Sequence, residues 1–428
     1  MEIRLYICFV VVLLFIGFPV TLSFFLPSIM YILLSGMSLD IILKQVVSGI
    51  DSFVYIAVPM FILAAQAMNE GESSERLFNF CDKLVGHIRG GMSHVNTVTS
   101  VIFAGMSGSA IADTTGIGYM CYKAMVNRGF DKAFSAALTI SSATVGPIIP
   151  PSIIMVMYAV IADTSVGQLF IAGIVPGLII GGALMVYCIA VANRYNFPRE
   201  KRPSLKEFLL SFRRATLPLI TPIILIGGIY TGVFTPTESA AVAATYALLL
   251  LVYYSLMKNE NPVKHFAKLA IETMKMSGMT MYIIACASVF SWIITRENIP
   301  QLFTNLLISY NISRPVFLLI STVIFLILGC FFDSNTILLV FVPIIIPTVK
   351  LLGINTVHFG VLVTLNLMVG MMTPPFGMQL FVVSGLTKVS IGDIIKKLWP
   401  MVIIIIGVLF LITYIEPLVM WLPNTMLK

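Results

Sequence analysis

Charged residues are scarce in this sequence. Asp, Glu, Lys and Arg make up 11% of its 428 residues, whereas soluble domains carry about 25%. Hydrophobic residues make up 58%, and the mean hydropathy is +1.00. This balance excludes a soluble globular domain and predicts an all-α protein that crosses a lipid bilayer many times. The net charge of +7 is then explained by Lys and Arg in cytoplasmic loops, so no nucleic-acid partner is expected.

The motifs of common cofactor and metal sites are also missing. The six cysteines form no C-x-x-C, and the four histidines form no H-E-x-x-H. There is no P-loop and no G-x-G-x-x-G, so neither an ATP-driven pump nor an organic cofactor is expected. Residues 105–109 (GMSGS) resemble a nucleophile elbow, but G-x-S-x-G requires Gly where Ser109 stands.

Two short polar stretches interrupt the hydrophobic sequence. Residues 105–114 (GMSGSAIADT), here called tip 1, lie between two apolar runs. Each run is too short to cross the hydrocarbon core, which takes about 20 helical residues. Residues 332–336 (FDSNT), here called tip 2, form a similar interruption. Because such backbone cannot face lipid, each tip is predicted to end a re-entrant helical hairpin inside the protein or beside water.

Two further interruptions contain adjacent prolines. Residues 146–151 (GPIIPP), here called break 1, divide one long apolar segment, and residues 370–375 (GMMTPP), break 2, divide another. Proline removes a backbone donor and clashes with the preceding turn, so each helix must unwind there and free carbonyl oxygens. The two breaks are 224 positions apart. Paired interruptions in matching positions predict two repeats with a binding site between them.

The distribution of positive charge predicts that these repeats are inverted. If both ends of the first hairpin are cytoplasmic and both ends of the second are extracytoplasmic, 20 of the 26 Lys and Arg residues fall inside and 6 outside. Cytoplasmic loops of membrane proteins carry such an excess. Both chain termini are then extracytoplasmic. The first apolar segment lacks an A-x-A-like cleavage site, so we interpret it as a retained membrane segment.

The pattern predicts five parts. Residues 1–86 and 215–312 each form scaffold helices and a surface arm, and a basic cytoplasmic loop covers 194–214. Residues 87–193 form one half of a transport domain, with a hairpin at 92–127, a broken helix at 131–160 and a helix at 169–193. Residues 313–428 form the other half, with a hairpin at 313–350, a broken helix at 356–386 and a final helix at 398–422.

Two local features complete this prediction. Residues 3–35 are too long for one comfortable span, so we favour two helices with almost no loop over a single helix. Thr235, Pro236 and Glu238 fit a capping box with proline at the first helical position.

Hydroxyl and carbonyl oxygens at the tips and breaks suit a weakly held monovalent cation such as Na⁺. The sequence therefore predicts one sodium site at tip 1 and break 1 and a second at tip 2 and break 2. The first would use Ser107, Ser109, Gly146, Ile149 and Pro151, and the second Asp333, Ser334, Asn335, Gly370, Thr373 and Pro375.

Two carboxylates lie within membrane segments. Such groups are functional candidates by default. For Asp113 and Asp333 the alternative is a helix N-cap that satisfies local N–H groups after each tip. The sequence leaves both interpretations open.

The chain resembles the large membrane subunit (M, DctM-like) of tripartite ATP-independent periplasmic (TRAP) transporters over essentially its whole length. The stretches that carry the resemblance are His87–Asn96 (HIRGGMSHVN), Gly105–Thr114 (GMSGSAIADT), Ser142–Ser152 (SATVGPIIPPS), Gly228–Val242 (GIYTGVFTPTESAAV) and Asn366–Gly377 (NLMVGMMTPPFG).

This resemblance implies sodium-coupled uptake of a small organic anion, typically a C4-dicarboxylate, sialic acid or other sugar acid, across the bacterial inner membrane. It implies an elevator mechanism, a separate small four-helix membrane subunit (Q) and a periplasmic substrate-binding protein (P). Matched position by position, it supports the first sodium site and places Gly108, Asp113 and Thr114 at the substrate cavity. Some members have Asn where this chain has Ser109.

Two alternatives remain open at this level. One is a single-component Na⁺/dicarboxylate or Na⁺/H⁺ carrier of the same superfamily. The other is an intramembrane enzyme that uses Asp113 and Asp333 as an acid pair. The repeat argues against the enzyme, because two-fold architecture serves alternating access in transporters.

Overall fold

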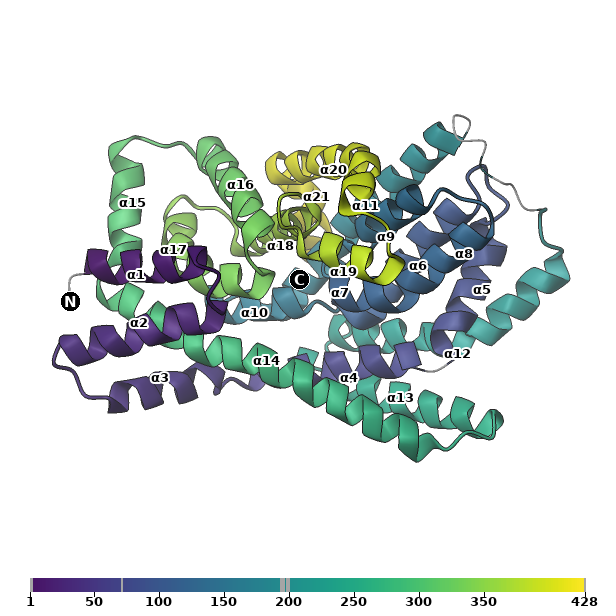
Figure 1. Ribbon diagram of the computed structural model, residues 1–428, viewed down its shortest axis with the longest axis horizontal. Helices are drawn as coiled ribbons and strands as arrows, with labels where there is room; N and C mark the ends of the chain where they lie inside the picture. The colour runs from purple at the N-terminus through teal and green to yellow at the C-terminus, as the bar shows by residue number, and fades with distance from the viewer. Residues whose placement is uncertain (1–2, 71, 193–196, 198–200, 427–428) are drawn as a thin grey trace.

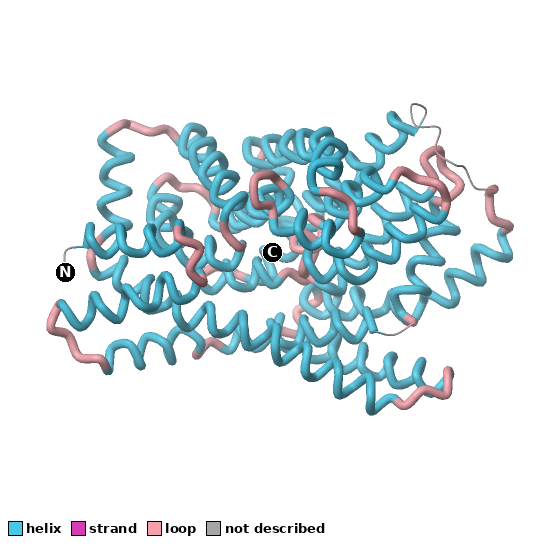
Figure 2. Tube along the Cα trace, viewed as in Figure 1, coloured by secondary structure: helices cyan, strands magenta, loops and turns pink. Residues whose placement is uncertain are grey.

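The computed structural model describes residues 3–426 except 71, 193–196 and 198–200. Across this part of the chain all regular structure is helical (Figure 2). Eight of these helices are long and apolar enough to cross a membrane, which confirms an all-helical polytopic membrane protein. Large apolar side chains such as Val186, Ile223 and Ile403 are exposed on them, as lipid-facing residues are.

The N-terminal segment forms two helices, as expected. They are α1 (Ile3–Phe15) and α2 (Val20–Leu34), and the turn between them contains Gly17 at φ 81°. Both are shorter than a span requires. They are followed by α3 (Asp40–Ile50), which packs along α14.

Long helices form the scaffold segments. The bounds are α4 (Ala57–Glu70), preceded by a 3₁₀ turn (Phe53–Ile56), α12 (Leu205–Tyr230), α13 (Pro236–Met257) and α14 (Pro262–Arg296). Helix α13 packs on α4 and α12, and α14 runs along the length of the molecule (Figure 1). The arms are α5 (Ser73–Val85) and α15 (Ile299–Ser309).

The basic loop is shorter than the sequence suggested. Residues 193–196 and 198–200 of the region around it lie outside the described residues, but α12 already begins at Leu205 rather than after 214. A capping box starts it there: Ser204 Oγ accepts from the Glu207 N–H, and the Glu207 carboxylate accepts from the Ser204 N–H.

Both predicted hairpins and both broken helices are helical, and their helices are interrupted at the tips and breaks. Hairpin 1 consists of α6 (Met92–Ser107), α7 (Ala110–Asp113), a π segment (Thr114–Gly118) and α8 (Tyr119–Asn127); hairpin 2 consists of α16 (Arg314–Phe331) and α17 (Ser334–Leu351). Break 1 separates α9 (Lys132–Ala143) from α10 (Ile153–Ala162), and break 2 separates α18 (Thr356–Met372) from α19 (Met378–Thr387). Helix α11 (Val166–Ala192) follows α10.

The final helix, expected at 398–422, differs from that expectation. It begins earlier, as α20 (Ile391–Tyr414), and a second helix follows as α21 (Glu416–Met426). The interruption falls at Ile415 (φ −109°, ψ 72°), two residues before Pro417. A proline there lacks the N–H that would continue the first helix and clashes with the turn before it.

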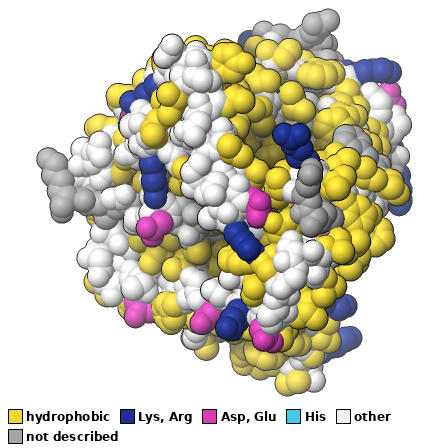
Figure 3. Space-filling model, turned by 90° about the vertical axis from the view of Figure 1, so that its left-hand side faces the viewer, with side chains coloured by type: hydrophobic (Ala, Val, Ile, Leu, Met, Phe, Trp, Pro, Cys, Tyr) yellow, Lys and Arg dark blue, Asp and Glu magenta, His cyan; other side chains and the backbone are white. Residues whose placement is uncertain are grey.

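The hairpins pack on the broken helices. Helix α6 contacts α9 and α11, α16 contacts α18, α17 contacts α10, and α7 contacts α19. Figure 3 looks onto the end of the molecule that carries α15 and shows a few charged side chains of both signs scattered among apolar and neutral ones. The tips and breaks therefore meet within a helical core, with α14, α4 and α13 along the lower edge of the view (Figure 1).

Candidate functional site

Tip 1 is a sharp turn that packs on break 1. Helix α6 ends at Ser107, Gly108 adopts a left-handed conformation (φ 64°), and Ser109 is the N-cap of α7, its Oγ accepting from the Ala112 N–H. A Cβ added at Gly108 would lie 2.4 Å from the Pro151 carbonyl oxygen. Only glycine allows both this backbone conformation and this close approach.

Asp113 lies beneath the tip and is fully buried. Its Oδ1 accepts a hydrogen bond from Ser107 Oγ, while Oδ2 has no hydrogen-bond partner among the described residues. A Cβ added at Gly146 would lie 2.2 Å from that Oδ2. Because Ser109 is the cap, the N-cap interpretation of Asp113 is wrong. The residue instead joins tip 1 to break 1.

Other groups near tip 1 and break 1 already make contacts elsewhere in the protein, so they are less available to bind a ligand. The Ile149 side chain packs on Gly177, where an added Cβ would lie 2.3 Å from its Cγ1. The carbonyl oxygen of Ile148 is turned toward Gly173. Thr114, placed by resemblance at the substrate cavity, is buried and donates its hydroxyl hydrogen to the Ala110 carbonyl at 2.7 Å. The structure thus brings together Ser107, Asp113 and Gly146 most closely.

A buried polar network near break 1 was not predicted from the sequence. Asn96 Nδ2 donates to Thr139 Oγ1 at 2.9 Å, and Ser142 Oγ donates to Asn96 Oδ1 at 2.9 Å. Ser100 Oγ lies 3.0 Å from Ser142 Oγ. The signal was present, because these polar residues interrupt apolar helices. The network holds α6 against α9.

Tip 2 has a different local structure. Asp333 is the N-cap of α17, its carboxylate accepting from the Asn335 N–H at 3.0 Å, so its capping interpretation fits. Ser334 is buried, and its Oγ donates to the Met371 sulfur at 3.0 Å.

Break 2 lies against this tip through backbone and side-chain contacts. A Cβ on Gly370 would lie 2.5 Å from Gly329 Cα, and Thr373 donates its hydroxyl hydrogen to the Val369 carbonyl at 2.6 Å. Pro375 and its neighbour Phe376 are exposed. Tip 2 therefore meets Met371 through Ser334, and Gly370 packs on Gly329 of α16, whereas Pro375 is exposed.

The donor set at tip 1 fits a hard monovalent cation. All available groups are oxygens, and the partnerless Oδ2 of Asp113 needs a hydrogen-bond donor or a cation. Among the described residues no three His, Cys, Asp or Glu side chains come together.

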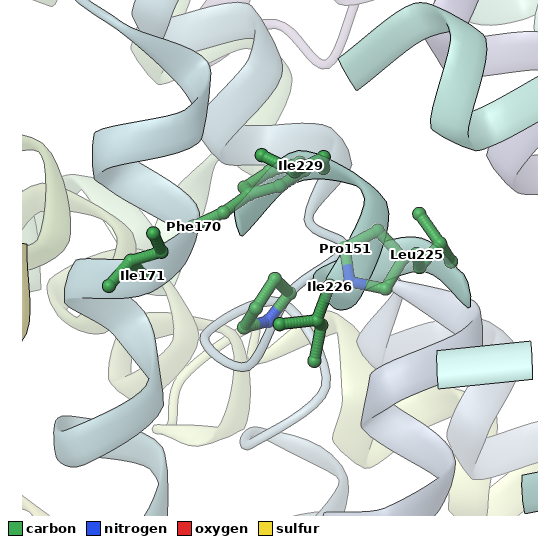
Figure 4. Close-up of a pocket in the computed structure, with 7 residues that line it drawn as sticks. Pro151, Phe170, Ile171, Leu225, Ile226 and Ile229 are labelled. Carbon is green, nitrogen blue, oxygen red and sulfur yellow. The ribbon is translucent and has the colours of Figure 1, made fainter. Parts of the chain in front are cut away.

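Two hollows lie outside the tips. A small apolar pocket beside break 1 is lined by Pro150, Pro151, Phe170, Ile171, Leu225, Ile226 and Ile229 (Figure 4). A cleft of about 440 Å³ opens between α3 and α14 on one side and α10 and α17 on the other. Its polar lining includes Gln45, Ser288 and Ser291 but no charged residue. It lies beside the contact between α14 and α17 of hairpin 2.

Comparison with known proteins identifies the family. Residues 7–418 match the model of the tripartite ATP-independent periplasmic transporter, DctM component. The chain is 37% identical over 418 residues to the sialic acid TRAP transporter large permease protein SiaM of Vibrio cholerae, covering 97% of each chain. It is 34% identical over 429 residues to the C4-dicarboxylate TRAP transporter large permease protein DctM of Rhodobacter capsulatus, again covering 97% of each.

Two further similarities add to this. The chain is 34% identical over 408 residues to the isethionate TRAP transporter permease protein DctMQ of Oleidesulfovibrio alaskensis, covering 95% of this chain and 64% of that longer protein. The YdaH transporter of Alcanivorax borkumensis has a similar fold, with a TM-score of 0.67 over 88% of each chain at 12% identity.

These matches exclude the intramembrane enzyme considered for Asp113 and Asp333, because the family is one of transporter permeases. The family match covers residues 7–418 and so includes both tips and both breaks. The chain therefore belongs to the DctM family and is a large permease subunit of a TRAP transporter.

Proposed function

We propose that this permease imports a small organic anion across the bacterial inner membrane, coupled to Na⁺ and dependent on a binding protein. The observation that carries the proposal is the buried, partnerless Oδ2 of Asp113 between tip 1 and break 1. A buried carboxyl oxygen without a partner is costly in a protein interior, and a bound cation removes that cost. The relatives' names point to sialic acid, C4-dicarboxylate and isethionate, all small organic anions.

Two inverted repeats form the basis of the proposed mechanism. The offset of 224 between the breaks recurs at the tips, where Ser109 and Asp333 are both N-caps of the second hairpin helix. Gly105 and Gly329, also 224 apart, both lie in close contact, the first with Pro222 and the second with Gly370. Matched N-caps, close-packed glycines and breaks support a common ancestral layout for both halves.

In this mechanism the hairpins and broken helices move together as a transport domain. The scaffold segments 1–86 and 215–312 stay fixed in the membrane, and residues 87–193 and 313–428 slide against them as an elevator. The 440 Å³ cleft between α14 and α17 supports this division, because packing is incomplete where the two bodies would slide.

Two sodium sites would couple the cycle. Site 1 comprises Ser107, Ser109 and the carbonyls of break 1, with Asp113 as an added carboxylate ligand. Site 2 lies at tip 2 and break 2 and uses the residues that the sequence predicts for the second sodium site. Its best-supported member is Ser334, which lies against break 2.

The proposed partners are a separate small four-helix membrane subunit (Q) and a periplasmic substrate-binding protein (P). The DctMQ relative, whose name joins M and Q, is longer than this chain, which supports a Q partner. The exposed apolar flanks of α12 and α13 leave surface for lipid or such a subunit.

Uptake by reconstituted vesicles tests this function. Permease, small subunit and loaded binding protein should accumulate labelled succinate, N-acetylneuraminate or isethionate only under an inward Na⁺ gradient. Accumulation by the permease without a binding protein would favour the single-component carrier. Accumulation with K⁺ in place of Na⁺ would contradict sodium coupling.

Ser107→Ala tests the first sodium site within that assay. The variant removes the tip 1 hydroxyl that donates to the Asp113 carboxylate. We expect the Na⁺ concentration for half-maximal uptake to rise about 10-fold, as for loss of one hydrogen bond to a charged group. Thr115→Ala is the control, because this exposed hydroxyl only donates to backbone carbonyls of its own segment. An unchanged Na⁺ curve for Ser107→Ala would remove this residue from the site.

A further inference from the structure

The two halves differ in polarity at one pair of buried positions. At the offset of 224, Asp113 of hairpin 1 corresponds to Ile337 of hairpin 2. Gln379, just after break 2, corresponds to Met155, just after break 1. All four side chains are fully buried. Asp113 and Gln379 are thus polar, whereas the side chains at the corresponding positions are apolar.

The helices that carry the polar pair contact each other, and so do the helices that carry the apolar pair. Helix α7, which ends at Asp113, contacts α19, which carries Gln379. Helix α17 with Ile337 contacts α10 with Met155 in the same way. The two corresponding positions in α10 and α17 are both apolar and buried. The layout shared by the two halves therefore does not by itself require polar side chains at Asp113 and Gln379.

Gln379 has no partner for its amide. Neither Nε2 nor Oε1 makes a hydrogen bond within the described residues. Its neighbours Met378 and Phe381 face outward, whereas Gln379 and Val383 lie on the buried face of α19, which packs on α7, the π segment and α9. Leaving a buried amide unsatisfied destabilises the fold, and methionine, which has a similar volume, would avoid that cost.

The amide group of Gln379 indicates which kind of ligand would satisfy it. A cation could satisfy only Oε1, whereas Nε2 requires an acceptor such as a carboxylate or sulfonate oxygen. Gln379 also stands in the first turn of α19, a ten-residue helix whose N-cap, Gly377, provides no side-chain cap. The positive end of a helix favours an anion.

We propose that Gln379 binds the transported organic anion at the α7/α19 interface and helps to set its specificity. This rests on the proposed function and adds a residue from the second half to the substrate site at Gly108, Asp113 and Thr114. The anionic group lies at the N-terminus of α19 and accepts from Gln379 Nε2. Sodium at Asp113 offsets the carboxylate beside it, so cation and anion bind together.

Gln379→Met tests the proposal, because it installs the residue that the other half carries. The purified permease with its small subunit is titrated with succinate, N-acetylneuraminate and isethionate in Na⁺, with thermal stabilisation as the binding readout. Uptake in vesicles is measured in parallel. We expect the solute concentration for half-maximal stabilisation to rise at least 10-fold for the transported solute. The Na⁺ concentration for half-maximal stabilisation without solute stays within about twofold.

Gln66→Met is the matched control. It removes an amide from scaffold helix α4, where Gln66 Nε2 donates to the Met276 sulfur at 3.1 Å. It should change neither solute nor Na⁺ dependence.

Two results would overturn the proposal while leaving the proposed function intact. Unchanged solute binding in Gln379→Met, with higher thermal stability, would make Gln379 an ordinary core residue. A shift in Na⁺ dependence with unchanged solute binding would make it a cation ligand. A different result would contradict the proposed function, namely a wild-type protein that shows no Na⁺-driven uptake. The binding titration still tests Gln379 in that case.

Discussion

Buried polar side chains in this permease fall into two kinds. Asn96, Thr139 and Ser142 form a closed network in which each side chain has a partner. Such networks fix one helix arrangement and leave nothing for a ligand. Asp113 and Gln379 are equally buried but keep partnerless atoms. Asn366 and Tyr254 also keep such atoms. Because native proteins rarely retain them without use, the proposals for cation and anion binding rest on Asp113 and Gln379.

The sequence could identify Asp113 but not its role. Ser109 and Asp113 are four positions apart, and either could begin the helix after tip 1. The choice depends on the backbone of Gly108, whose left-handed turn makes Ser109 the cap. Gln379 gave no signal by itself, because an unsatisfied amide is visible only when its surroundings are known. Which buried groups find partners is a property of packing.

Gly146→Ala should weaken sodium coupling. The added Cβ would lie 2.2 Å from Asp113 Oδ2, so the carboxylate must shift away from break 1. We expect the Na⁺ concentration for half-maximal uptake to rise roughly 10-fold or more, as for a displaced charged ligand. Uptake against Na⁺ concentration in reconstituted vesicles measures it.

Gly182→Ala is the control for that substitution. Gly182 lies in α11 with nothing within 4 Å of an added Cβ, and alanine favours a helix. It should leave the Na⁺ curve unchanged. If Gly146→Ala behaves like Gly182→Ala, Asp113 does not belong to a cation site at this position.

At the scale of helices, most boundaries follow from local chemistry. The capping box at Thr235 and Glu238 was predicted and is confirmed, with Thr235 Oγ1 accepting from the Glu238 N–H. The equivalent box at Ser204 was overlooked because seven Lys and Arg in 194–214 dominated that stretch. The interruption at Ile415 was overlooked because the apolar sequence continues through it. Local signals thus mark helix ends, provided that composition does not mask them.

Thr235→Ala should destabilise the start of α13. The substitution removes the side-chain oxygen that accepts from the Glu238 N–H, a loss of about 1 kcal/mol for an N-cap threonine. Thermal unfolding in detergent should show a lower midpoint with no change in Na⁺ dependence. Thr245→Ala in the middle of α13 is the control, because its exposed hydroxyl only bonds the Ala241 carbonyl. Equal midpoints for the two variants would show that the cap contributes nothing.

At the scale of the whole molecule, the order of segments was predictable and their lengths were not. Prolines at 147–151 and 374–375 fix both breaks, since no helix continues through them. The length of α14 could not be predicted, because its polar first half resembles a loop. Its 35 residues extend about 52 Å, beyond a hydrocarbon core of about 30 Å. Its polar first half is held against α4, where Lys268 pairs with Glu70.

The proposed inverted topology makes a prediction about sidedness that two exposed residues can test. The arm residue Tyr310 is 73% exposed and Leu205 at the start of α12 is 74% exposed, so a thiol reagent reaches both equally well in detergent. With 20 of 26 Lys and Arg placed inside, Leu205 is cytoplasmic and Tyr310 extracytoplasmic. Single cysteines are introduced at these positions in a Cys8→Ser background, because Cys8 is exposed. A membrane-impermeant maleimide should label Tyr310→Cys in intact spheroplasts and Leu205→Cys only after permeabilisation. Labelling of both from outside, or the reverse pattern, would contradict the inverted arrangement and with it the two-sided access on which the elevator depends.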